Sequence, residues 1–511
     1  MVSKRVLPSA QAHRPEVPKE VPLDGQDLAM PRMAMHCTWF FLSPMQPFLK
    51  ELSREELENA FTFGMELFLA RFPAAAGRTK HEPSSGRWYL EYNDQGADLE
   101  VVQSDQPLGD GWKGFDGKFD PAFAPRPVLI VDDNSTLFAV KLTRFSCGSL
   151  TLSTSTHHWL VDFVGYVDLV EQFGQCVSLF LSEEANAFRS QANIRFDWSR
   201  DLLKYANQVN PDPIPTDIWF NERGQPPQMT RAPSSCRYAS LLFTPSSLEK
   251  LKGTLAEWAL TDSLQGESAG VLPSKENWIG TNDALHALLW AAITDARSLE
   301  SDAVTGLHLP LDGRRLLPSL AKPDEANGKY IGNVHSGHVF PLPASRVSSK
   351  DRSSLFHLAW LIRTQYLSLT PGQMSSIIRY HNYAESSSFG PGRLPRNTSM
   401  FGNDVTISNI SRLPVRERVH FGDKIGRPYT HTVIGMVPVT LNGLTLDSAD
   451  GTCFILKAPG EWTSYEAAKR HQPIAGQEEK EPGVVAYVGM RCEEMQALLK
   501  NPLIQQFAVV L

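Results

Sequence analysis

The sequence predicts an α/β protein with two large domains, and three observations lead to this prediction. The chain has 511 residues, whereas a single domain has roughly 150. Strand-like and helix-like patterns alternate along both halves of the chain. Between residues 206 and 236, prolines and glycines interrupt both patterns and predict a crossover linker. We expect an N-terminal domain at 1–205, the linker at 206–236 and a C-terminal domain at 237–511.

The first long predicted helix begins after Ser53. Ser53 and Glu56 have the spacing of a capping box, in which each side chain accepts a hydrogen bond from the other residue's backbone amide. Apolar residues then recur on one helical face, at Leu57, Phe61, Met65 and Phe68. Pro73 ends the pattern. This segment is therefore expected to be an amphipathic helix packed on a core.

Two strands and a second helix are predicted between residues 136 and 180. Residues 136–159 are rich in β-branched and aromatic side chains, and Cys147-Gly148 marks a turn between two strand-like runs. From Phe163 to Phe180, apolar residues recur near the helical period. The pair His157-His158 thus falls where a strand passes into a helix.

The C-terminal half continues the alternation. Helices are predicted around 246–260 and over 282–297, where leucine and alanine recur at helical spacing.

The composition excludes several classes of protein. With 42% hydrophobic and 21% charged residues, the chain resembles an ordinary globular protein. The formal charge of -7 is not gathered into blocks, so no nucleic acid is expected as a partner. The six cysteines have no paired spacing, which is typical of reduced thiols. No segment has the pattern of a secretion signal or a membrane span. We expect a cytoplasmic protein with no membrane partner.

His158 is the candidate catalytic residue. Imidazole has a pKa of about 6.5 and accepts a proton at neutral pH, which makes it the usual general base in group transfer. Asp162 follows at HxxxD spacing, and we interpret it as an orienting carboxylate. One HxxxD pattern also arises by chance around a core histidine, so it needs support elsewhere in the chain. His157 points to the other face of a continuing strand and is expected to serve packing.

Three other patterns compete with His158. Ser268 stands in a GxSxG pattern typical of serine hydrolases, but a helix and a polar loop precede it where that motif needs a buried strand. His335 and His338 have the spacing of a metal pair without a supporting carboxylate or cysteine cluster, so no metal is expected. Trp39 and Phe41 leave two alternatives open, because they either line an apolar acceptor pocket or belong to a core.

Several segments, in the same order along nearly the whole chain, resemble the BAHD acyltransferases, which transfer acyl groups from coenzyme A thioesters to hydroxyls or amines of natural products. These segments are FPAAAGR at 72–78, FSCG at 145–148, the helix at 285–297, DGR at 312–314, YIGN at 330–333 and SNISRLP at 408–414. Residues 419–428 depart from the family's Asp-Phe-Gly-Trp-Gly signature, and Phe163 replaces the glycine that usually follows HxxxD. These departures are similar to those of fungal secondary-metabolite O-acetyltransferases.

The resemblance implies a chloramphenicol acetyltransferase-like fold. Two similar domains, each a mixed sheet flanked by helices, are joined by a long crossover loop, and residues at about 415–432 return toward the N-terminal domain. Asp162 is expected to pair with Arg314. Ser408 and Asn409 are expected at the oxyanion and the substrate. The divergent loop at 419–428 is expected to be structural.

The resemblance also implies the reaction partners. The protein is expected to be a monomer without a tightly bound cofactor, and acyl-CoA is its co-substrate. Acetyl-CoA is the expected donor because acetyl is the family's commonest acyl group. The acceptor, a small molecule, reacts with the donor directly in a ternary complex, in agreement with the absence of an activated nucleophile.

Two alternatives use the same fold. His157 and His158 together also fit the HHxxxD pattern of condensation-type domains, which take their acyl group from a carrier-protein thioester. A non-catalytic protein that binds small molecules is the other alternative, and the intact His158 and Asp162 argue against it.

Overall fold

The structure is a computed structural model. It describes residues 2–30, 32–108, 135–182, 196–213, 234–264, 272–321, 328–348, 352–386, 402–434, 439–441, 444–446, 450–459 and 482–511, together with Pro125 and Arg231.

The N-terminal half forms a mixed six-stranded sheet with the order β1-β6-β7-β8-β3-β15. The strands are β1 (Val2–Val6), β6 (Ala97–Gln103), β7 (Phe138–Arg144), β8 (Leu150–His157), β3 (Ala34–Phe41) and β15 (Thr430–Ile434). Strands β6 and β7 run parallel, and the neighbouring pairs are antiparallel. Helices α2 (Arg54–Arg71) and α4 (Phe163–Leu181) contact each other and share one hydrophobic core with the sheet.

The C-terminal half forms a mixed seven-stranded sheet with the order β13-β11-β14-β18-β19-β10-β20. The strands are β13 (His335–Pro343), β11 (Val304–Asp312), β14 (Val405–Asn409), β18 (Thr452–Lys457), β19 (Val484–Arg491), β10 (Cys236–Phe243) and β20 (Val509–Val510). The surrounding helices are α7 (Pro245–Leu264), α8 (Thr281–Ala296), α10 (Arg352–Ser368), α15 (Cys492–Leu499) and α16 (Pro502–Phe507). Two mixed sheets, each with its own helices, confirm the predicted fold class.

Smaller elements surround the two sheets. The strands β2 (Glu20–Pro22), β5 (Arg87–Glu91) and β4 (Arg78–Glu82) form a three-stranded sheet, and β16 (Val439–Leu441) pairs with β17 (Leu444–Leu446). The short helices are α1 (Gly25–Leu28), α3 (Pro73–Ala76), α5 (Leu203–Ala206), α9 (Pro318–Ala321), α12 (Val415–Arg418) and α13 (Gly422–Ile425), and α11 (Pro371–Ser386) is longer.

Local sequence patterns account for the predicted elements. The Ser53 side chain accepts a hydrogen bond from the Glu56 amide at 3.1 Å, and the Glu56 carboxylate accepts one from the Ser53 amide at 2.8 Å, so the capping box begins α2 as predicted. Gly148, with φ of +85°, turns the chain between β7 and β8. The helices predicted at 246–260 and 282–297 are α7 and α8.

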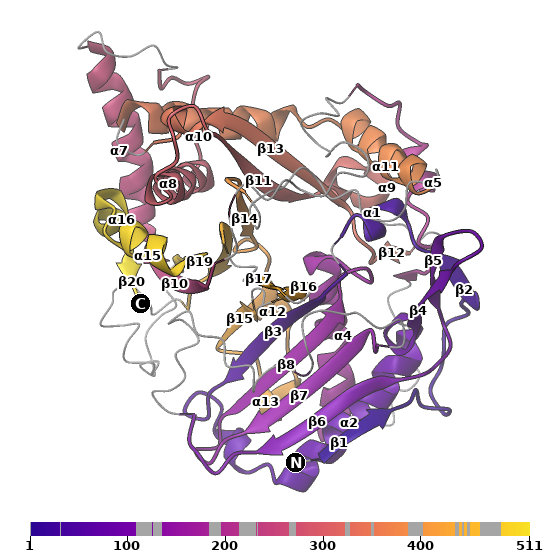
Figure 1. The fold of residues 1–511 in the computed structure, drawn as a ribbon. Helices are drawn as coiled ribbons and strands as arrows, with labels where there is room; N and C mark the ends of the chain where they lie inside the picture. The colour runs from indigo at the N-terminus through magenta and orange to yellow at the C-terminus, as the bar shows by residue number, and fades with distance from the viewer. Residues whose placement is uncertain are drawn as a thin grey trace.

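A segment of the C-terminal half joins the N-terminal sheet. Strand β15 follows the C-terminal strand β14 along the chain, yet it pairs with β3 of the N-terminal sheet, with His431 opposite Trp39. Figure 1 shows β15 beside β3 at the edge of the N-terminal sheet. Residues 415–434 therefore lie on the N-terminal domain. Of the linker predicted at 206–236, residues 206–213, 231 and 234–236 are described.

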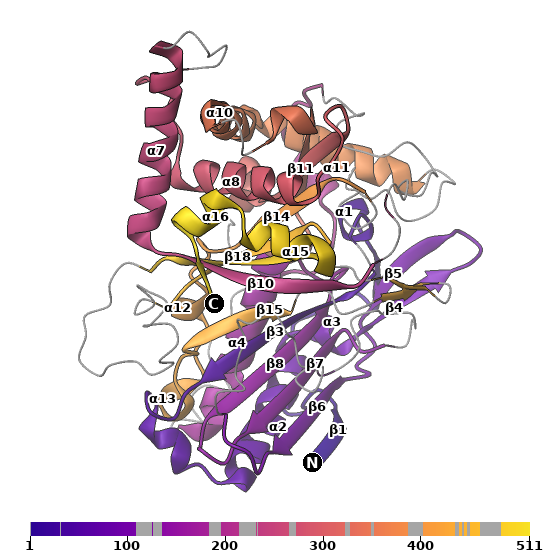
Figure 2. The same cartoon turned by 60° about the vertical axis from the view of Figure 1, so that its left-hand side comes forward.

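Other contacts also join the halves. Helix α1 lies against α11, as Figures 1 and 2 both show. Strand β9 (Phe196–Asp197) pairs with β12 (Lys329–Tyr330). An apolar cluster places Phe40 and Leu42 of the N-terminal half with Leu242 and Tyr487 of the C-terminal half. The segments around His158 are therefore supported from both domains.

Candidate active site

His158 lies in the turn between β8 and α4. We call residues 158–160 the His158 turn. Strand β8 ends at His157, and α4 begins at Phe163. The His158 amide donates to the Met33 carbonyl at 2.9 Å, and the Leu160 amide donates to the His157 carbonyl at 2.9 Å. The strand-to-helix position predicted for His158 is confirmed.

Asp162 begins helix α4. Its Oδ1 accepts a hydrogen bond from the Gly165 amide at 3.0 Å, and its Oδ2 accepts one from the Val334 amide at 3.1 Å. Arg314 donates to both oxygens, at 2.7 Å to Oδ2 and 3.1 Å to Oδ1. Among the described hydrogen bonds, none joins this carboxylate to the His158 ring. Asp162 is therefore placed to orient the turn.

The Asp162–Arg314 ion pair connects the two halves of the molecule. The side chains are only 14% and 10% exposed. Arg314 also donates to the Gly332 carbonyl at 2.5 Å and to Asp312 at 3.1 Å. Burial by itself lowers the pKa of Arg314, but the charges of Asp162 and Asp312 raise it above its ordinary value. The guanidinium thus stays charged beside the carboxylate.

The imidazole of His158 is half-buried. Burial lowers its pKa below the ordinary value, because the charged form loses solvation. The backbone of His158, the charge of Asp162 and the side chain of Asn333 partly oppose this effect. The lowered pKa leaves the imidazole neutral at pH 7, in the form that accepts a proton.

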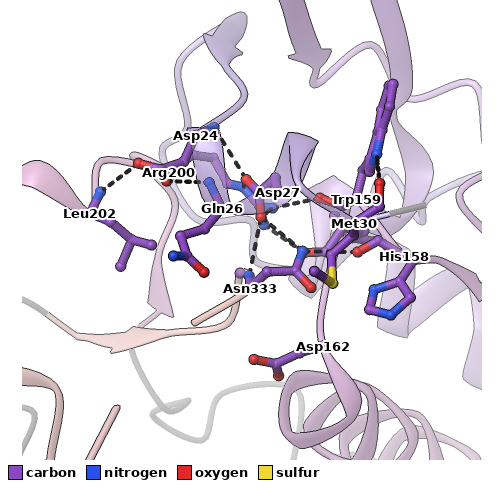
Figure 3. A network of polar contacts seen from close by, with 12 residues as sticks. Asp24, Gln26, Asp27, Met30, His158, Trp159, Asp162, Arg200, Leu202 and Asn333 are labelled. Atoms are coloured by element: carbon purple, nitrogen blue, oxygen red, sulfur yellow. Dashed lines mark hydrogen bonds and ion pairs between the residues drawn. The ribbon is translucent and has the colours of Figure 1, made fainter. Parts of the chain in front are cut away.

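Three residues that hold the His158 turn were not predicted from the sequence. Asn333 donates through Nδ2 to the His158 carbonyl at 2.8 Å and to Asp27 at 2.9 Å (Figure 3). Arg200 donates to the carbonyls of Trp159 and Leu160. Asn333 stood in the YIGN segment without an assigned role, whereas Asp27 and Arg200 lie in short segments that show no periodicity.

Two other histidines lie near the site. His157 is buried, and its Nδ1 accepts a hydrogen bond from the Trp159 amide at 3.0 Å, which is a structural use. His335 is buried at the start of β13 and stacks on His381, with ring centroids 6.1 Å apart. Burial, with the nearby His381 and His158, lowers the pKa of His335 well below its ordinary value. No group of three potential metal ligands occurs in the described part of the chain.

Ser408 and Asn409 end strand β14 in the C-terminal sheet. The Asn409 Oδ1 accepts hydrogen bonds from the amide and the hydroxyl of Ser411, and its Nδ2 faces His286 at 3.1 Å. The side-chain amide of Asn409 thus already makes hydrogen bonds at the end of β14. Within the described residues, no hydrogen bond joins Ser408 or Asn409 to the His158 turn.

The pocket interpretation of Trp39 and Phe41 is wrong, because both side chains belong to the N-terminal hydrophobic core, with 0% and 1% exposure. Trp39 donates to the Thr154 hydroxyl at 3.0 Å and stacks on His431, while Phe41 packs edge-on against Phe421. Phe40, between them, faces the apolar cluster that joins the two halves. Both faces of β3 are therefore covered, and the core alternative holds.

The divergent loop at 419–428, here called the Phe421 loop, packs on the N-terminal core. Phe421 is fully buried and contacts Phe41 and Phe61, with ring centroids 5.6 and 5.9 Å away. Gly174 of α4 permits this approach, because a Cβ there would lie 2.5 Å from the His420 carbonyl oxygen. These contacts pack the loop against the N-terminal core.

The structure bears only partly on two further expectations, the GxSxG pattern and the absence of a membrane span. Ser268 and its GxSxG pattern lie outside the described residues. No helix in the described ranges combines the length and apolarity needed to cross a membrane.

Comparison with known proteins gives one family and a relative of full length. A model of the Transferase family matches residues 1–375. The chain is 65% identical over 513 residues to acyltransferase uat1 of Mycosarcoma maydis, and the alignment covers 100% of both chains. It is also 23% identical over 340 residues to the omega-hydroxypalmitate O-feruloyl transferase of Arabidopsis thaliana, with 65% of this chain and 66% of that protein covered.

Solved structures show the same fold at low sequence identity. TRI101 of F. graminearum, complexed with coenzyme A and deoxynivalenol, superimposes with a TM-score of 0.67 at 16% identity and covers 96% of this chain and 99% of its own. Vinorine synthase superimposes with a TM-score of 0.59 at 12% identity and covers 97% and 95%.

Proposed function

Because the chain belongs to the BAHD acyltransferase family, we propose that it transfers an acyl group from acyl-CoA to a hydroxyl or amine of a small natural product, with His158 as general base. Acetyl-CoA is the proposed donor. TRI101, which shares the fold, was crystallised with coenzyme A and a small-molecule acceptor, and this supports the proposed pairing of substrates.

The observation that carries the proposal is the half-buried imidazole of His158 in the strand-to-helix turn, beside a carboxylate that Arg314 holds. The pKa of His158 is lowered by burial, so the base form prevails at neutral pH. Asp162 is occupied by Arg314 and by two backbone amides. His158 is therefore a proton acceptor whose orienting carboxylate is held by other groups, which suits general-base catalysis without an acyl-enzyme.

The proposed reaction proceeds in two steps. The acceptor oxygen or nitrogen attacks the thioester carbonyl carbon while His158 takes its proton, which gives a tetrahedral oxyanion. The carbon–sulfur bond then breaks, the imidazolium returns the proton to the thiolate, and coenzyme A leaves as the free thiol. Proton transfer of this kind typically contributes about 10²- to 10⁴-fold to the rate.

Ser408 is the proposed oxyanion donor. Its side chain is half-buried at the end of β14, and within the described residues it makes no side-chain hydrogen bond. A hydroxyl in that position has its proton available for the substrate. One preorganised donor of this kind is typically worth about 2.7 to 4 kcal/mol. The Asn409 side chain, already bonded to Ser411, is proposed to hold the strand end.

The proposal also includes a cytoplasmic monomer. All six cysteines are free thiols in the structure, as is typical of a reducing compartment. A fluorescent fusion followed by microscopy tests the location, and light scattering of the purified protein tests the monomer.

The decisive experiment compares wild-type protein with His158→Ala and with His13→Ala, which removes an exposed histidine and serves as the matched control. Each protein is incubated with acetyl-CoA and a panel of alcohols and amines that includes deoxynivalenol, and released coenzyme A is measured. We expect His158→Ala to lose about 10² to 10⁴ in turnover, while its circular dichroism and that of the control remain unchanged. Near-wild-type transfer by His158→Ala would overturn the proposal.

Three further outcomes separate the alternatives. Transfer only from an acyl group on a carrier protein would indicate a condensation-type enzyme. Acceptor binding without transfer from any acyl-CoA would indicate a binding protein. Labelling by a fluorophosphonate probe, lost in Ser268→Ala, would indicate a serine hydrolase.

A further inference from the structure

Three consecutive backbone carbonyls in the His158 turn accept hydrogen bonds from buried side chains. Figure 3 shows His158, Trp159, Arg200 and Asn333. The His158 carbonyl accepts from Asn333 Nδ2 at 2.8 Å. The carbonyls of Trp159 and Leu160 accept from Arg200, at 2.7 and 2.6 Å. Because each peptide group in the turn has its own donor, its direction is fixed by side chains from other segments of the chain.

Asp27 joins the two donors. Its Oδ1 accepts from the backbone amide and the Nδ2 of Asn333, at 3.1 and 2.9 Å. Its carboxylate also pairs with Arg200, at 2.6 Å from Nη2 to Oδ1 and 3.1 Å from Nε to Oδ2. All three side chains are at least 98% buried. Asp27, Arg200 and Asn333, which we call the turn clamp, therefore form one connected polar network.

The turn clamp is costly for the fold. Arg200 has φ of +56°, in the left-handed region that a residue with a side chain rarely adopts. The Asp27–Arg200 pair also places two charges out of water, and such a pair is often no more stabilising than apolar residues of the same volume. Backbone strain and buried charge of this kind concentrate at functional sites, where geometry matters more than stability.

The segments of the clamp come from both halves of the molecule. Asp27 lies in α1 and Arg200 follows β9, while Asn333 precedes β13. The next residue, Val334, donates to Asp162. The clamp and the Asp162–Arg314 pair thus hold opposite ends of the segment from His158 to Asp162.

We propose that Asp27, Arg200 and Asn333 are positioning residues, which fix the backbone of the His158 turn and so aim the imidazole at the acceptor. This inference rests on the proposed role of His158 and adds the residues that orient it. None of the three is proposed to touch substrate. A misplacement of about 1 Å at a reacting group is enough to lower the rate on the order of 10²-fold.

Asn382 provides a matched control for Asn333. It is an asparagine beside the same short helix, where its Nδ2 donates to Asp24 at 3.1 Å and its Oδ1 accepts from the Gly25 amide at 3.2 Å. Among the described hydrogen bonds, none connects it to the His158 turn. Loss of either asparagine removes hydrogen bonds at α1, but only Asn333 reaches His158.

The test compares Asn333→Ala with Asn382→Ala, using acetyl-CoA and the acceptor that supports wild-type turnover. We expect Asn333→Ala to lower kcat about 10- to 100-fold, with KM for acetyl-CoA within about twofold of wild type. Asn382→Ala should keep kcat within about twofold. Equal losses of kcat in the two variants, or an unchanged kcat in Asn333→Ala, would overturn the inference.

Two further readouts separate positioning from a purely structural role. The side chain of Asn333 raises the pKa of His158, so Asn333→Ala should move the acid limb of the rate profile to lower pH. An NMR titration of ¹⁵N-labelled histidine should show the same shift without any acceptor. A pH profile and titration identical to wild type would contradict positioning by Asn333.

Arg200→Lys keeps the test decisive if Asn333→Ala fails to fold. Lysine retains the positive charge opposite Asp27, but it lacks the planar fork that reaches the carboxylate and both carbonyls together. We expect a folded protein with at least a tenfold lower kcat, and wild-type kcat would contradict the inference. If His158→Ala is inactive while Arg200→Lys and Asn333→Ala keep full rate, only this inference fails. If His158→Ala stays active, the proposed function fails.

Discussion

The His158 turn and the Phe421 loop both carry family signatures, but the fold holds them in opposite ways. The turn is held by directional hydrogen bonds from Asn333 and Arg200 to its backbone. The loop is held mainly by packing of a buried phenylalanine against other aromatic rings, with one hydrogen bond from the Gln46 side chain to the Arg427 carbonyl. Hydrogen bonds specify the partner atoms and their angles, whereas apolar packing mainly specifies volume. This difference explains how the loop can depart from the family pattern while the HxxxD turn keeps it.

The largest effect on this comparison is expected from Arg314→Ala, which leaves Asp162 buried without its cation. Removal of one partner from a buried ion pair typically costs about 3 to 5 kcal/mol. Because Asp162 also caps α4 next to the His158 turn, turnover should fall by at least tenfold. Urea unfolding and steady-state kinetics measure the two effects.

Arg5→Ala is the matched control for Arg314→Ala. The pair between Arg5 and Asp98 is exposed, with 46% and 43% of the two side chains accessible. Exposed pairs contribute about 0 to 1 kcal/mol, so both stability and turnover should remain near wild type. Equal destabilisation in the two arginine variants would mean that the Asp162–Arg314 pair has no special role.

Phe421→Ala should lower stability with little effect on the chemistry. Deletion of a buried phenylalanine ring costs about 3 to 5 kcal/mol, and the ring contacts described for Phe421 are with Phe41, Phe61 and Phe173, outside the His158 turn. We expect a lower urea midpoint and a kcat per folded molecule within about twofold of wild type. Phe48→Ala, at a side chain that is 53% exposed, is the control and should change neither value. A tenfold loss of kcat in Phe421→Ala would erase the distinction between loop and turn.

Local sequence patterns predicted the helices and strands around the site, but not the side chains that hold the His158 turn. Ser53 and the apolar face of α2 lie within a few turns of each other in sequence, and Gly148 turns a hairpin between neighbouring strands. Capping and periodicity are therefore readable from the chain. The contact of Asn333 with Asp27 spans 306 residues and that of Arg200 with Asp27 spans 173. No periodic pattern records such pairings.

The Asp162–Arg314 pair and the surroundings of β3 depend on contacts between distant parts of the chain, which sequence patterns do not contain. The contact between Asp162 and Arg314 was expected only from the family resemblance, because 152 residues separate the two. The sequence left Trp39 and Phe41 open between pocket and core because it does not reveal that one face of β3 packs on the N-terminal core and the other on the cluster between the two halves. Once both faces of a strand are covered, alternation no longer distinguishes a pocket side from a core side.

A change of pH is expected to have a smaller effect on the rate, through the protonation of His158 alone. Since burial lowers the pKa of His158 below its ordinary value of about 6.5, its base form should predominate above pH 6.5, and kcat/KM should level off toward pH 8. Below the lowered pKa, kcat/KM should fall tenfold per pH unit as the imidazole gains a proton. A limb centred clearly above pH 6.5 would contradict the neutral, desolvated base.

Acid also weakens the fold, and this effect must be measured separately. Burial lowers the pKa of His286, His308 and His431 to about 4, below the value of about 6.5 in the unfolded chain. Between pH 6.5 and 4 the unfolded state thus binds more protons, so stability is full above pH 6.5 and is lost as the pH falls. Circular dichroism at each pH separates the loss of folded protein from the loss of rate.

The smallest expected effect comes from Ser53→Ala, which acts on the packing side of the comparison. Ser53 caps α2, and α2 supplies Phe61, against which Phe421 stacks. Loss of an N-cap side chain costs about 1 kcal/mol, so the urea midpoint should fall slightly while kcat stays unchanged. Ser53→Asp should restore most of the lost stability, because aspartate also caps helices and its charge suits a helix N-terminus. A fall in kcat that tracks the fall in stability would show that α2 and the His158 turn are coupled, although the hydrogen bonds of the turn come from elsewhere.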